Sequence, residues 1–280
     1  SGKDWDLARR SGGIKILPPN INEQSGGVLV PASRLESLKN ISVALDRIKS
    51  DYVVLSDCDV ICNPDIGKLL QRHAQSGAKI TMLVRRTEFH GAVQDKTSLV
   101  DFDEQGRITG VQVNPIYVTG QRYRDLNIWV VNTEFLQYVV REAIARGYDS
   151  FNRDVISRYC TKYDFRAVEF DGFFACITTF SDYYMHSMDL LESAEVRDAL
   201  FGVKDRPVYT KLHNSAPAYY APDAIVKNSI IADGCQIEGV VENSVLFRGV
   251  KVGPESVVRN CVLFQNTVVG RECFLSCIVS

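Results

Sequence analysis

The stretch YVVLSDCDVICNPDIGKLLQRHAQSGAKITMLV, residues 52–84, decides the fold class of this chain. It opens with apolar strand-forming residues that end in Ser-Asp-Cys-Asp, and a helix signal follows almost at once. Asn63 suits an N-cap, Pro64 suits the first helical position, and Gly77 suits the C-terminal stop. A second apolar strand is expected over residues 80–84. The stretch therefore predicts a strand, a helix and a strand in direct succession, which is the repeating unit of α/β folds.

The same alternation of strands and helices returns further along the chain. Asn132 suits the cap of a second helix that stops near Gly147, and a hairpin around Gly106 interrupts the pattern. Strands are expected over residues 126–131 and 165–170, a further helix over residues 151–159, and the hairpin over residues 97–113. Alternation of this kind predicts a doubly wound, mainly parallel α/β sheet.

A second domain is indicated by a repeat near the C-terminus. Four similar short stretches begin at Asn228, Asn243, Asn260 and Ser276, and the second and third are 17 residues apart. Repeats of this length with short β-rich segments predict a parallel β-helix of hexapeptide repeats, with about three hexads per coil. Because a coil cannot bury its apolar face alone, we expect this domain to be incomplete at its C-terminus or covered by another chain.

The domain boundaries follow from a change in composition after Pro207. Helical periodicity stops there, and residues 209–222 are rich in Pro, Ala, Ser and Tyr, as a connecting segment would be. We therefore expect an α/β domain over residues 1–206, a linker over residues 207–223 and the β-helix over residues 224–280.

Bulk properties exclude several classes of function. The formal net charge of −2 and the pI near 6.1 leave no excess of basic residues for a nucleic-acid partner. No apolar run approaches the roughly 20 residues of a membrane-spanning helix, and the first residues lack the apolar core of a signal peptide. We expect a cytoplasmic protein with no membrane partner.

The eight cysteines are expected to be reduced and buried. They stand mostly inside apolar runs and form no regular framework. Cys58 and Cys62 have no second Cys or His pair nearby, so their spacing does not indicate a zinc site.

Three stretches resemble the ADP-glucose pyrophosphorylase family, the glucose-1-phosphate adenylyltransferases. Residues 52–66 resemble the family's strand ending in Gly-Asp-His. FDGFFACITTFSDYYMHSMDLL, residues 170–191, resembles its Glu-Gly-Tyr-Trp-Arg-Asp-Val-Gly-Thr segment and the next helix. RPVYTKLHNSAPAYY, residues 206–220, resembles its Pro-Ile-Tyr-Thr linker. The resemblance implies a nucleotidyltransferase-like α/β domain followed by a left-handed β-helix.

The family transfers the adenylyl group of ATP to glucose 1-phosphate and releases pyrophosphate. Both substrates are polyanions, so the reaction needs Mg²⁺, carboxylates that hold it, and cationic groups that grip phosphate. The resemblance places the first metal carboxylate at Asp59, with Asp57 as the alternative. The second aligns with Cys176, whose thiol is a poor replacement for a hard oxygen ligand.

Other family motifs are also altered. The lysine of Glu-Lys-Pro, which grips the sugar phosphate, is replaced by Asn114, and Asp-Phe-Gly of the sugar pocket resembles Ser150-Phe151-Asn152. The Gly-Thr-Ala-Asp-Ala loop has no match near ASRLES, residues 32–37. The Gly-rich nucleotide loop is absent from these 280 residues, and neither Gly12-Gly13 nor Gly26-Gly27 replaces it. Losing one oriented charge from such a site typically costs about 2.7–4 kcal/mol of transition-state stabilisation.

The resemblance therefore implies a non-catalytic, regulatory subunit of bacterial glycogen biosynthesis, truncated at its N-terminus. Its expected partner is a catalytic subunit in a hetero-oligomer, or a second copy of itself, and no bound cofactor is expected although the family uses Mg²⁺.

Three alternatives to these expectations stay open. The first is an active adenylyltransferase with a divergent site built on Asp57 and Asp59. A hexapeptide-repeat acyltransferase is less favoured, because it needs a histidine between coils and none lies beyond His213. Arg85-Arg86 and Arg9-Arg10 are candidates for an anionic effector site, although a solvated charged surface explains them as well.

Overall fold

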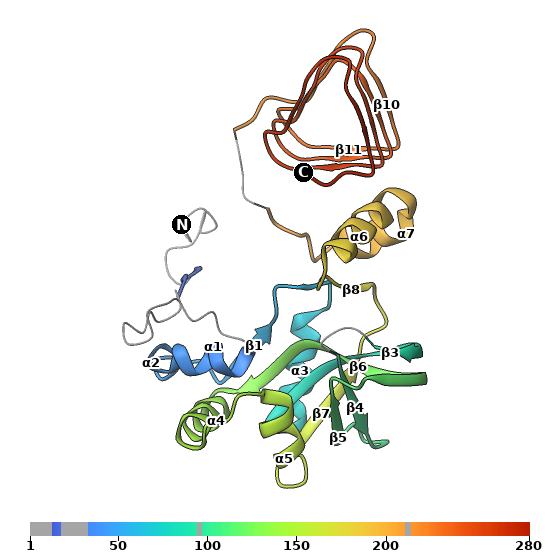
Figure 1. Cartoon of the computed structure of the whole chain (residues 1–280). Coiled ribbons are helices and arrows are strands. Elements are labelled where there is room, and N and C mark those ends of the chain that lie inside the picture. The colour runs from blue at the N-terminus through green and yellow to red at the C-terminus, as the bar shows by residue number, and fades with distance from the viewer. Residues whose placement is uncertain (1–12, 18–32, 94–96, 211–213) are drawn as a thin grey trace. The chain divides into compact units, whose positions relative to one another are not determined.

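A computed structural model describes residues 13–17, 33–93, 97–210 and 214–280 of the chain (Figure 1). The chain divides into two compact units, Ser1–Phe174 and Ala175–Ser280. This division lies before the boundary predicted at residue 206, because two helices group with the β-helix. One of these helices carries Tyr184, whose hydroxyl donates a hydrogen bond of 2.9 Å to the carbonyl of Asn260.

The first unit contains a mixed sheet. Its strands are β1 (Tyr52–Ser56), β3 (Ile80–Ala92), β4 (Ser98–Phe102), β5 (Ile108–Val113), β6 (Tyr117–Asn132) and β7 (Phe165–Glu169). The order is β5-β4-β6-β3-β7, with β1 also paired to β6. The strand β6 runs antiparallel to β1, β3 and β4, whereas β3 and β7 run parallel.

The layered α/β architecture is confirmed, but the prediction of a mainly parallel sheet is wrong. The long strand β6 is reached through the predicted hairpin of β4 and β5 instead of a helical crossover, so it enters the sheet against its neighbours. The hairpin also covers β7: the amide of Ala167 donates to the carbonyl of Gly106 at 2.8 Å. This contact protects a strand edge that would otherwise expose unpaired backbone groups.

Two helices of the first unit have caps that were predicted from the sequence, and one of the predicted N-caps is wrong. They are α1 (Arg34–Asn40), α2 (Ser42–Leu45), α3 (Ile66–Ser76), α4 (Thr133–Arg146), the π-helix η3 (Phe151–Ile156) and α5 (Ser157–Tyr159). Asn132 caps α4, and Gly77 and Gly147 end α3 and α4 in the left-handed region, as predicted. Helix α3 is capped by Asp65 and not by Asn63: the Asp65 carboxylate accepts the amide of Lys68 at 2.9 Å.

A buried apolar core joins α1, α4 and η3 to the sheet. Trp129, Phe165 and Leu136 are among its largest fully buried side chains. Burying a side chain of this size stabilises a fold by about 1.5–3 kcal/mol. The core therefore fixes the positions of the strand ends and helix starts from which the polar side chains project.

The second unit begins with the end of β8 (Phe174–Cys176) and continues into α6 (Phe180–Glu192) and α7 (Ala194–Phe201). Helix α6 starts with a capping box, in which Thr179 and Asp182 each accept the other's backbone N–H. Hydrogen bonds from the side chains of Thr178 and Thr179 lower the pKa of Asp182 to about 2. The carboxylate therefore stays ionised at the positive end of the helix dipole, where a negative charge is stabilising.

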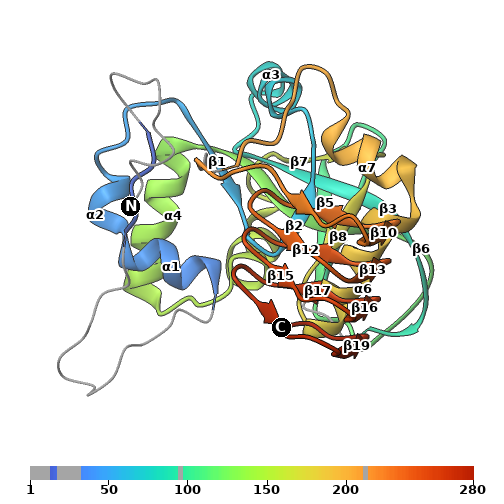
Figure 2. The ribbon, with the colours of Figure 1, turned by 90° about the horizontal axis from the view of Figure 1, so that it is seen from above.

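The rest of the second unit is a parallel β-solenoid, as predicted. Its strands form three sheets, ordered β10-β13-β16-β19, β11-β14-β17 and β18-β15-β12-β9. They are β9 (Tyr219–Tyr220), β10 (Ile225–Lys227), β11 (Ile230–Ile231), β12 (Gln236–Ile237), β13 (Val240–Glu242), β14 (Val245–Leu246), β15 (Lys251–Val252), β16 (Val257–Arg259), β17 (Val262–Leu263), β18 (Val268–Val269) and β19 (Phe274–Ser276). Figure 1 shows the coils end-on as a triangle, and Figure 2 shows them stacked in chain order. Strand β9 pairs with β12, so the solenoid starts within the predicted linker and before residue 224.

One corner of the solenoid is formed by residues with positive φ. Asn228, Asn243 and Asn260 occupy it at 41°, 47° and 51°, and Cys277 takes the fourth place at 56°. The repeat therefore continues at Cys277 and not at Ser276, since Ser276 pairs with Arg259. Asparagine tolerates this left-handed conformation better than most residues, and the Asn228 amide donates to the side chain of Asn243 at 2.9 Å.

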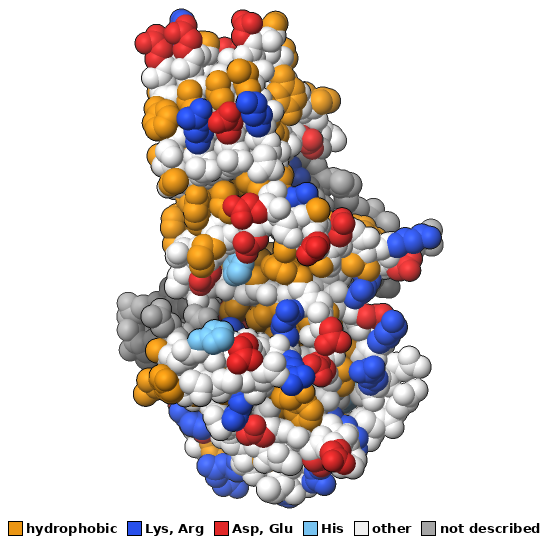
Figure 3. All heavy atoms as spheres, turned by 90° about the vertical axis from the view of Figure 1, so that its right-hand side faces the viewer, with side chains coloured by type: hydrophobic (Ala, Val, Ile, Leu, Met, Phe, Trp, Pro, Cys, Tyr) orange, Lys and Arg blue, Asp and Glu red, His pale blue; other side chains and the backbone are white. Residues whose placement is uncertain are grey.

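Charges on the exposed side of the solenoid alternate between coils. Lys227, Glu242 and Arg259 are aligned on neighbouring strands, and Arg259 lies 2.8 Å from Glu242. Figure 3 shows basic and acidic side chains side by side on this part of the surface. Opposite charges at facing positions favour this strand register.

The cysteines and the helices bear on two further expectations. All eight cysteines lie in the described residues as thiols, but only Cys160, Cys235 and Cys261 are buried, while Cys58 and Cys277 are exposed. The expectation of buried thiols is thus met only in part. Within the described ranges, every helix is too short or too polar to cross a lipid bilayer.

Two glycines that are 17 residues apart are expected to differ in their tolerance of alanine. A Cβ on Gly253 would lie 2.4 Å from the carbonyl oxygen of Gly270, whereas a Cβ on Gly270 would meet only the sulfur of Cys273 at 3.7 Å. Gly253→Ala should therefore destabilise the solenoid by about 1–3 kcal/mol, and Gly270→Ala should change it by less than about 0.5 kcal/mol. Urea unfolding of both variants measures the difference. Equal losses of stability in the two variants would contradict the close approach of Gly253 to Gly270 in the next coil.

Candidate functional site

An ion pair stands at the end of β1, where the sequence placed a metal carboxylate. The Asp57 carboxylate follows the last residue of the strand, and its side chain is 34% exposed. Arg34 approaches it from the first turn of α1, with Nε at 2.9 Å and Nη2 at 2.7 Å from the same oxygen, Oδ1. The guanidinium thus neutralises this carboxylate directly.

The guanidinium of Arg34 is held on two further sides. Its Nη2 also donates to the carbonyl of Asn127 at 2.6 Å, and its Cζ lies 4.3 Å from the ring centre of Trp129. The Arg34 side chain is only 13% exposed. Stacking of a guanidinium on an indole adds cation–π attraction to the ion pair.

Trp129 connects this cluster to a second, buried carboxylate. Its indole Nε1 donates to Asp125 Oδ1 at 2.9 Å, and the amide of Asn127 donates to the same atom at 2.9 Å. Asp125 is only 4% exposed, and burial raises its pKa, although the hydrogen bond from Trp129 and the charge of Arg34 act in the opposite direction. A strand interior holds this carboxylate because neighbouring donors compensate part of its desolvation.

Two of the sugar-pocket residues predicted from the sequence bond to neighbouring residues at one end of the β4–β5 hairpin. The amide of Asn114 donates to the carbonyl of Thr97 at 2.9 Å, and the Asn152 side chain donates to Ser98 Oγ at 2.7 Å. The contacts of Asp57, Arg34, Trp129 and Asp125 thus form one cluster, while Asn152 is joined to the hairpin through Ser98.

The other two predicted pocket residues have structural partners. Phe151 is buried and packs edge-on against Trp129, with ring centres 5.0 Å apart. Ser150 caps η3 by accepting the amide of Arg153 at 3.2 Å. Phe151 and Ser150 therefore have structural roles in packing and helix capping, and these roles explain their presence without a ligand.

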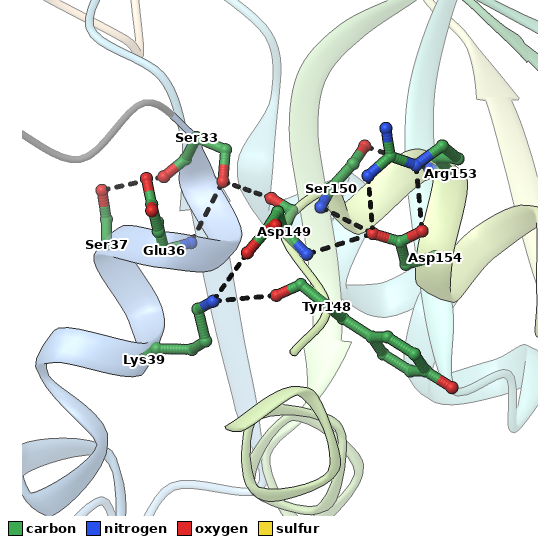
Figure 4. A network of polar contacts seen from close by, with 9 residues as sticks. All are labelled: Ser33, Glu36, Ser37, Lys39, Tyr148, Asp149, Ser150, Arg153 and Asp154. Carbon is green, nitrogen blue, oxygen red and sulfur yellow. Dashed lines mark hydrogen bonds and ion pairs between the residues drawn. The ribbon is translucent and has the colours of Figure 1, made fainter. Parts of the chain in front are cut away.

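Helix α1 is fixed to the loop before η3, as Figure 4 shows. Ser33 caps α1 by accepting the amide of Glu36 at 3.1 Å and donates its hydroxyl to the carbonyl of Asp149. Lys39 donates to the carbonyl of Tyr148 at 2.9 Å and to the Asp149 carboxylate at 3.0 Å. Helix α1, and with it Arg34, is therefore anchored at both of its ends.

The same loop is ordered by Asp154, also drawn in Figure 4. Its Oδ2 accepts the amides of Asp149 at 3.1 Å and Ser150 at 2.9 Å. Arg153 makes a two-point contact with the carboxylate, and the pKa of Asp154 is held well below its usual range, chiefly by that arginine. A stable ionised carboxylate at this place keeps η3 in position.

The described residues fit Mg²⁺ poorly. Both Asp57 contacts with Arg34 use Oδ1, so a positive charge already lies beside this carboxylate. Asp59 Oδ1 is the exception, since it is buried without a hydrogen-bond partner among the described residues. No three His, Cys, Asp or Glu side chains in the described part of the chain gather closely enough to hold a metal ion. Cys176, which the family resemblance aligns with the second metal carboxylate, ends β8 in the second unit.

The candidate effector arginines differ in their surroundings. Arg85 donates to the carbonyl of Gly172, so it is engaged by its own chain, whereas Arg86 is exposed. Arg9 and Arg10 lie outside the described residues, as do Gly12, Gly26, Gly27 and His213. The effector site therefore remains a prediction.

Four residues of the network were missed from the sequence: Arg34, Asp125, Asn127 and Trp129. Their contacts join positions up to 93 residues apart, between α1 and β6. The one sequence signal was Asp125, a single carboxylate just before the apolar strand residues that follow it. A charge at that place indicates either a partner inside the fold or a functional role.

Comparison with known proteins places these features in context. Residues 218–280 match the family model described as GlmU-like, C-terminal hexapeptide. The chain is 25% identical over 91% of its length to a glucose-1-phosphate adenylyltransferase of Clostridium novyi, covering 66% of that protein. It is 26% identical over 90% of its length to the glycogen biosynthesis protein GlgD of Bacillus subtilis, covering 62%.

A third relative is somewhat more similar. The chain is 30% identical over 91% of its length to a glucose-1-phosphate adenylyltransferase of Thermosipho africanus, covering 61% of it. The chain thus spans slightly less than two thirds of the length of each of these relatives.

The buried carboxylate of Asp125 should make stability depend on pH. Burial raises its pKa above the usual value near 3.8, so the folded chain binds this proton more tightly than the unfolded chain does. The ionised form therefore opposes folding more strongly as pH rises above that value. Asp125→Asn removes the titration but keeps an oxygen acceptor for Trp129, so its stability relative to wild type should increase with pH.

Urea unfolding of both proteins between about pH 4 and about pH 8 measures this trend. Asp46→Asn, at an exposed aspartate paired with Arg141 at 2.8 Å, is the matched control and should show no such increase. A relative stability of Asp125→Asn that falls as pH rises would contradict the assignment of Asp125 as a desolvated acid.

Proposed function

The chain belongs to the glucose-1-phosphate adenylyltransferase family, and from this we propose that it is a non-catalytic, regulatory subunit in glycogen biosynthesis. It would assemble with a catalytic subunit that makes ADP-glucose from ATP and glucose 1-phosphate, and modulate its rate. One of its relatives carries the name of a glycogen biosynthesis protein instead of that of a transferase, which supports this role.

The observation that carries the proposal is the loss of charge at the site. Transfer of a nucleotidyl group between two polyanions needs oriented cations and a metal held by carboxylates. In this chain Asn114 stands where the family has its phosphate-gripping lysine, and Cys176 stands where it has a metal carboxylate. Asp57 is already neutralised by Arg34. Each missing charge raises the barrier by about 2.7–4 kcal/mol.

The scaffold around the altered site supports a role in assembly. The caps of α3, α4 and α6, the core of the first unit and the register of the solenoid are all intact. A chain that keeps its packing while its charged site positions change retains surfaces on which a partner subunit can dock. A cytoplasmic location and a hetero-oligomer belong to this proposal.

The alternative is an active adenylyltransferase with a divergent site. It is favoured by one observation, the Asp59 carboxylate, whose Oδ1 is buried without a hydrogen-bond partner in the described residues. A buried carboxylate oxygen without a partner is destabilising, and a hydrogen-bond donor or a bound cation would offset that cost. Asp59 is therefore the residue whose removal separates the two functions.

Assays with and without a catalytic subunit test the proposal. The purified chain, supplied with ATP, Mg²⁺ and glucose 1-phosphate, should release no measurable pyrophosphate, since two lost charges alone slow the reaction by about 10⁴-fold or more. Added to the catalytic subunit from the same source, the chain should co-elute with it and change its kcat or its KM.

Two results would overturn this function. Pyrophosphate release by the chain alone that disappears in Asp59→Asn would establish the active enzyme. Failure to bind the catalytic subunit, together with an unchanged partner rate, would remove the regulatory role. Asp46→Asn, at an exposed aspartate of the first unit, controls for non-specific effects of losing a carboxylate.

A further inference from the structure

The guanidinium of Arg34 lies beside Asp57, at a strand end where a metal ion could bind. Carboxylates at the carboxyl ends of strands in α/β sheets commonly face a ligand or a metal. At the end of β1, the space beside Asp57 Oδ1 instead contains two guanidinium nitrogens, at 2.7 and 2.9 Å. A guanidinium keeps its positive charge at every physiological pH.

We propose that Arg34 is a built-in cation that takes the place of a divalent metal at Asp57, so that this site is assembled without a metal and excludes one. The proposal rests on the proposed function only in taking Asp57 as a candidate for the family's metal position. It concerns the binding of an ion and does not depend on whether the chain is catalytic.

The geometry keeps Arg34 from moving aside for an ion. Nη2 is shared between Asp57 and the carbonyl of Asn127, and Cζ lies over the indole ring of Trp129. A metal ion binding at Asp57 Oδ1 would have to displace the hydrogen bonds that Arg34 makes to this oxygen and would disturb its contacts with Asn127 and Trp129. It would also meet a like charge in a largely buried setting, where repulsion is poorly screened.

The backbone behind Arg34 is fixed as well. Ser33 caps α1 and donates to the carbonyl of Asp149, and Lys39 is 3.0 Å from the Asp149 carboxylate. The helix therefore cannot carry Arg34 away from Asp57 without losing contacts at both of its ends. Arg34 thus holds α1, the end of β1 and β6 together, as a bound metal ion holds its ligands together.

Removal of Arg34 should therefore create a metal site. In Arg34→Gln the Asp57 carboxylate loses its counter-ion, and Asp59 follows two residues later in the chain. Carboxylates with water as the remaining ligands suit Mn²⁺ and Mg²⁺. The wild-type chain should bind neither ion in a manner that depends on Asp57.

Paramagnetic broadening by Mn²⁺ provides a direct readout. The chain has two tryptophans, Trp5 and Trp129, so the indole N–H signal that persists in Trp5→Phe belongs to Trp129. In wild type this signal should stay sharp as Mn²⁺ is added. In Arg34→Gln it should broaden at Mn²⁺ concentrations lower by at least about tenfold, because a full like charge has been removed nearby.

Three further variants complete the experiment. Arg34→Gln combined with Asp57→Asn should return to the wild-type response. Arg141→Gln is the matched control, since Arg141 makes a 2.8 Å ion pair with Asp46 on an exposed surface; the Trp129 signal should not change. Arg34→Lys keeps the positive charge and should also resist Mn²⁺, so it tests the proposal if Arg34→Gln does not fold.

Two outcomes would overturn the proposal. One is wild-type broadening of the Trp129 signal that Asp57→Asn abolishes. The other is a folded Arg34→Gln whose Trp129 signal stays as sharp as that of wild type, or an Arg34→Lys whose signal broadens at lower Mn²⁺ concentrations than that of wild type. Catalytic activity with no Mn²⁺ effect at Trp129 would defeat the regulatory function and leave the role of Arg34 in place, so the two failures are distinguishable.

Discussion

The compensation of two carboxylates, the partly exposed Asp57 and the buried Asp125, by a single guanidinium underlies the first unit of this protein. Arg34 contacts Asp57 directly and, through its charge, lowers the pKa of Asp125, which burial raises. The same side chain ties α1 to β6 through the carbonyl of Asn127. Removing one member of such a cluster leaves an uncompensated charge, which is far more costly than replacing the whole set by apolar residues.

The second unit depends on a different constraint, the register of its coils. Each strand of the solenoid stacks in parallel on its equivalent in the next coil, and apolar side chains such as Val241 and Val258 fill the interior. A corner residue with positive φ recurs in each repeat, three times as asparagine. The two units thus reach stability by separate means, which allows the site to change while the solenoid keeps its pattern.

Local chemistry made much of this fold predictable. Gly77, Asn132 and Gly147 were found from the sequence because caps and left-handed stops are set by neighbouring residues. The hairpin and the solenoid followed from alternation and repeat length. The direction of β6 was not predictable, because strand orientation depends on which strands pair and not on the residues of one strand.

The site was predictable only in outline. Family motifs pointed to Asn114, Asn152 and Asp59, with Asp57 as the alternative. In the structure Asp57 pairs with Arg34, the Asn152 side chain donates to Ser98, and the backbone amide of Asn114 donates to Thr97. Arg34 was missed because an ion pair between positions 23 residues apart leaves no periodic signal in the sequence. The cap of α3 was misplaced by two residues, since Asn63 and Asp65 are both good caps and the fold decides between them.

A double-mutant cycle between Arg34 and Asp57 tests the central role of this ion pair most directly. Unfolding free energies of Arg34→Gln, Asp57→Asn, the double variant and wild type give the coupling energy. We expect a favourable coupling of about 1–3 kcal/mol, typical of a hydrogen-bonded pair of charged groups that is partly shielded from solvent, and the same value with and without Mg²⁺. A coupling energy near zero, or one that Mg²⁺ abolishes, would contradict the central role of the Arg34–Asp57 ion pair.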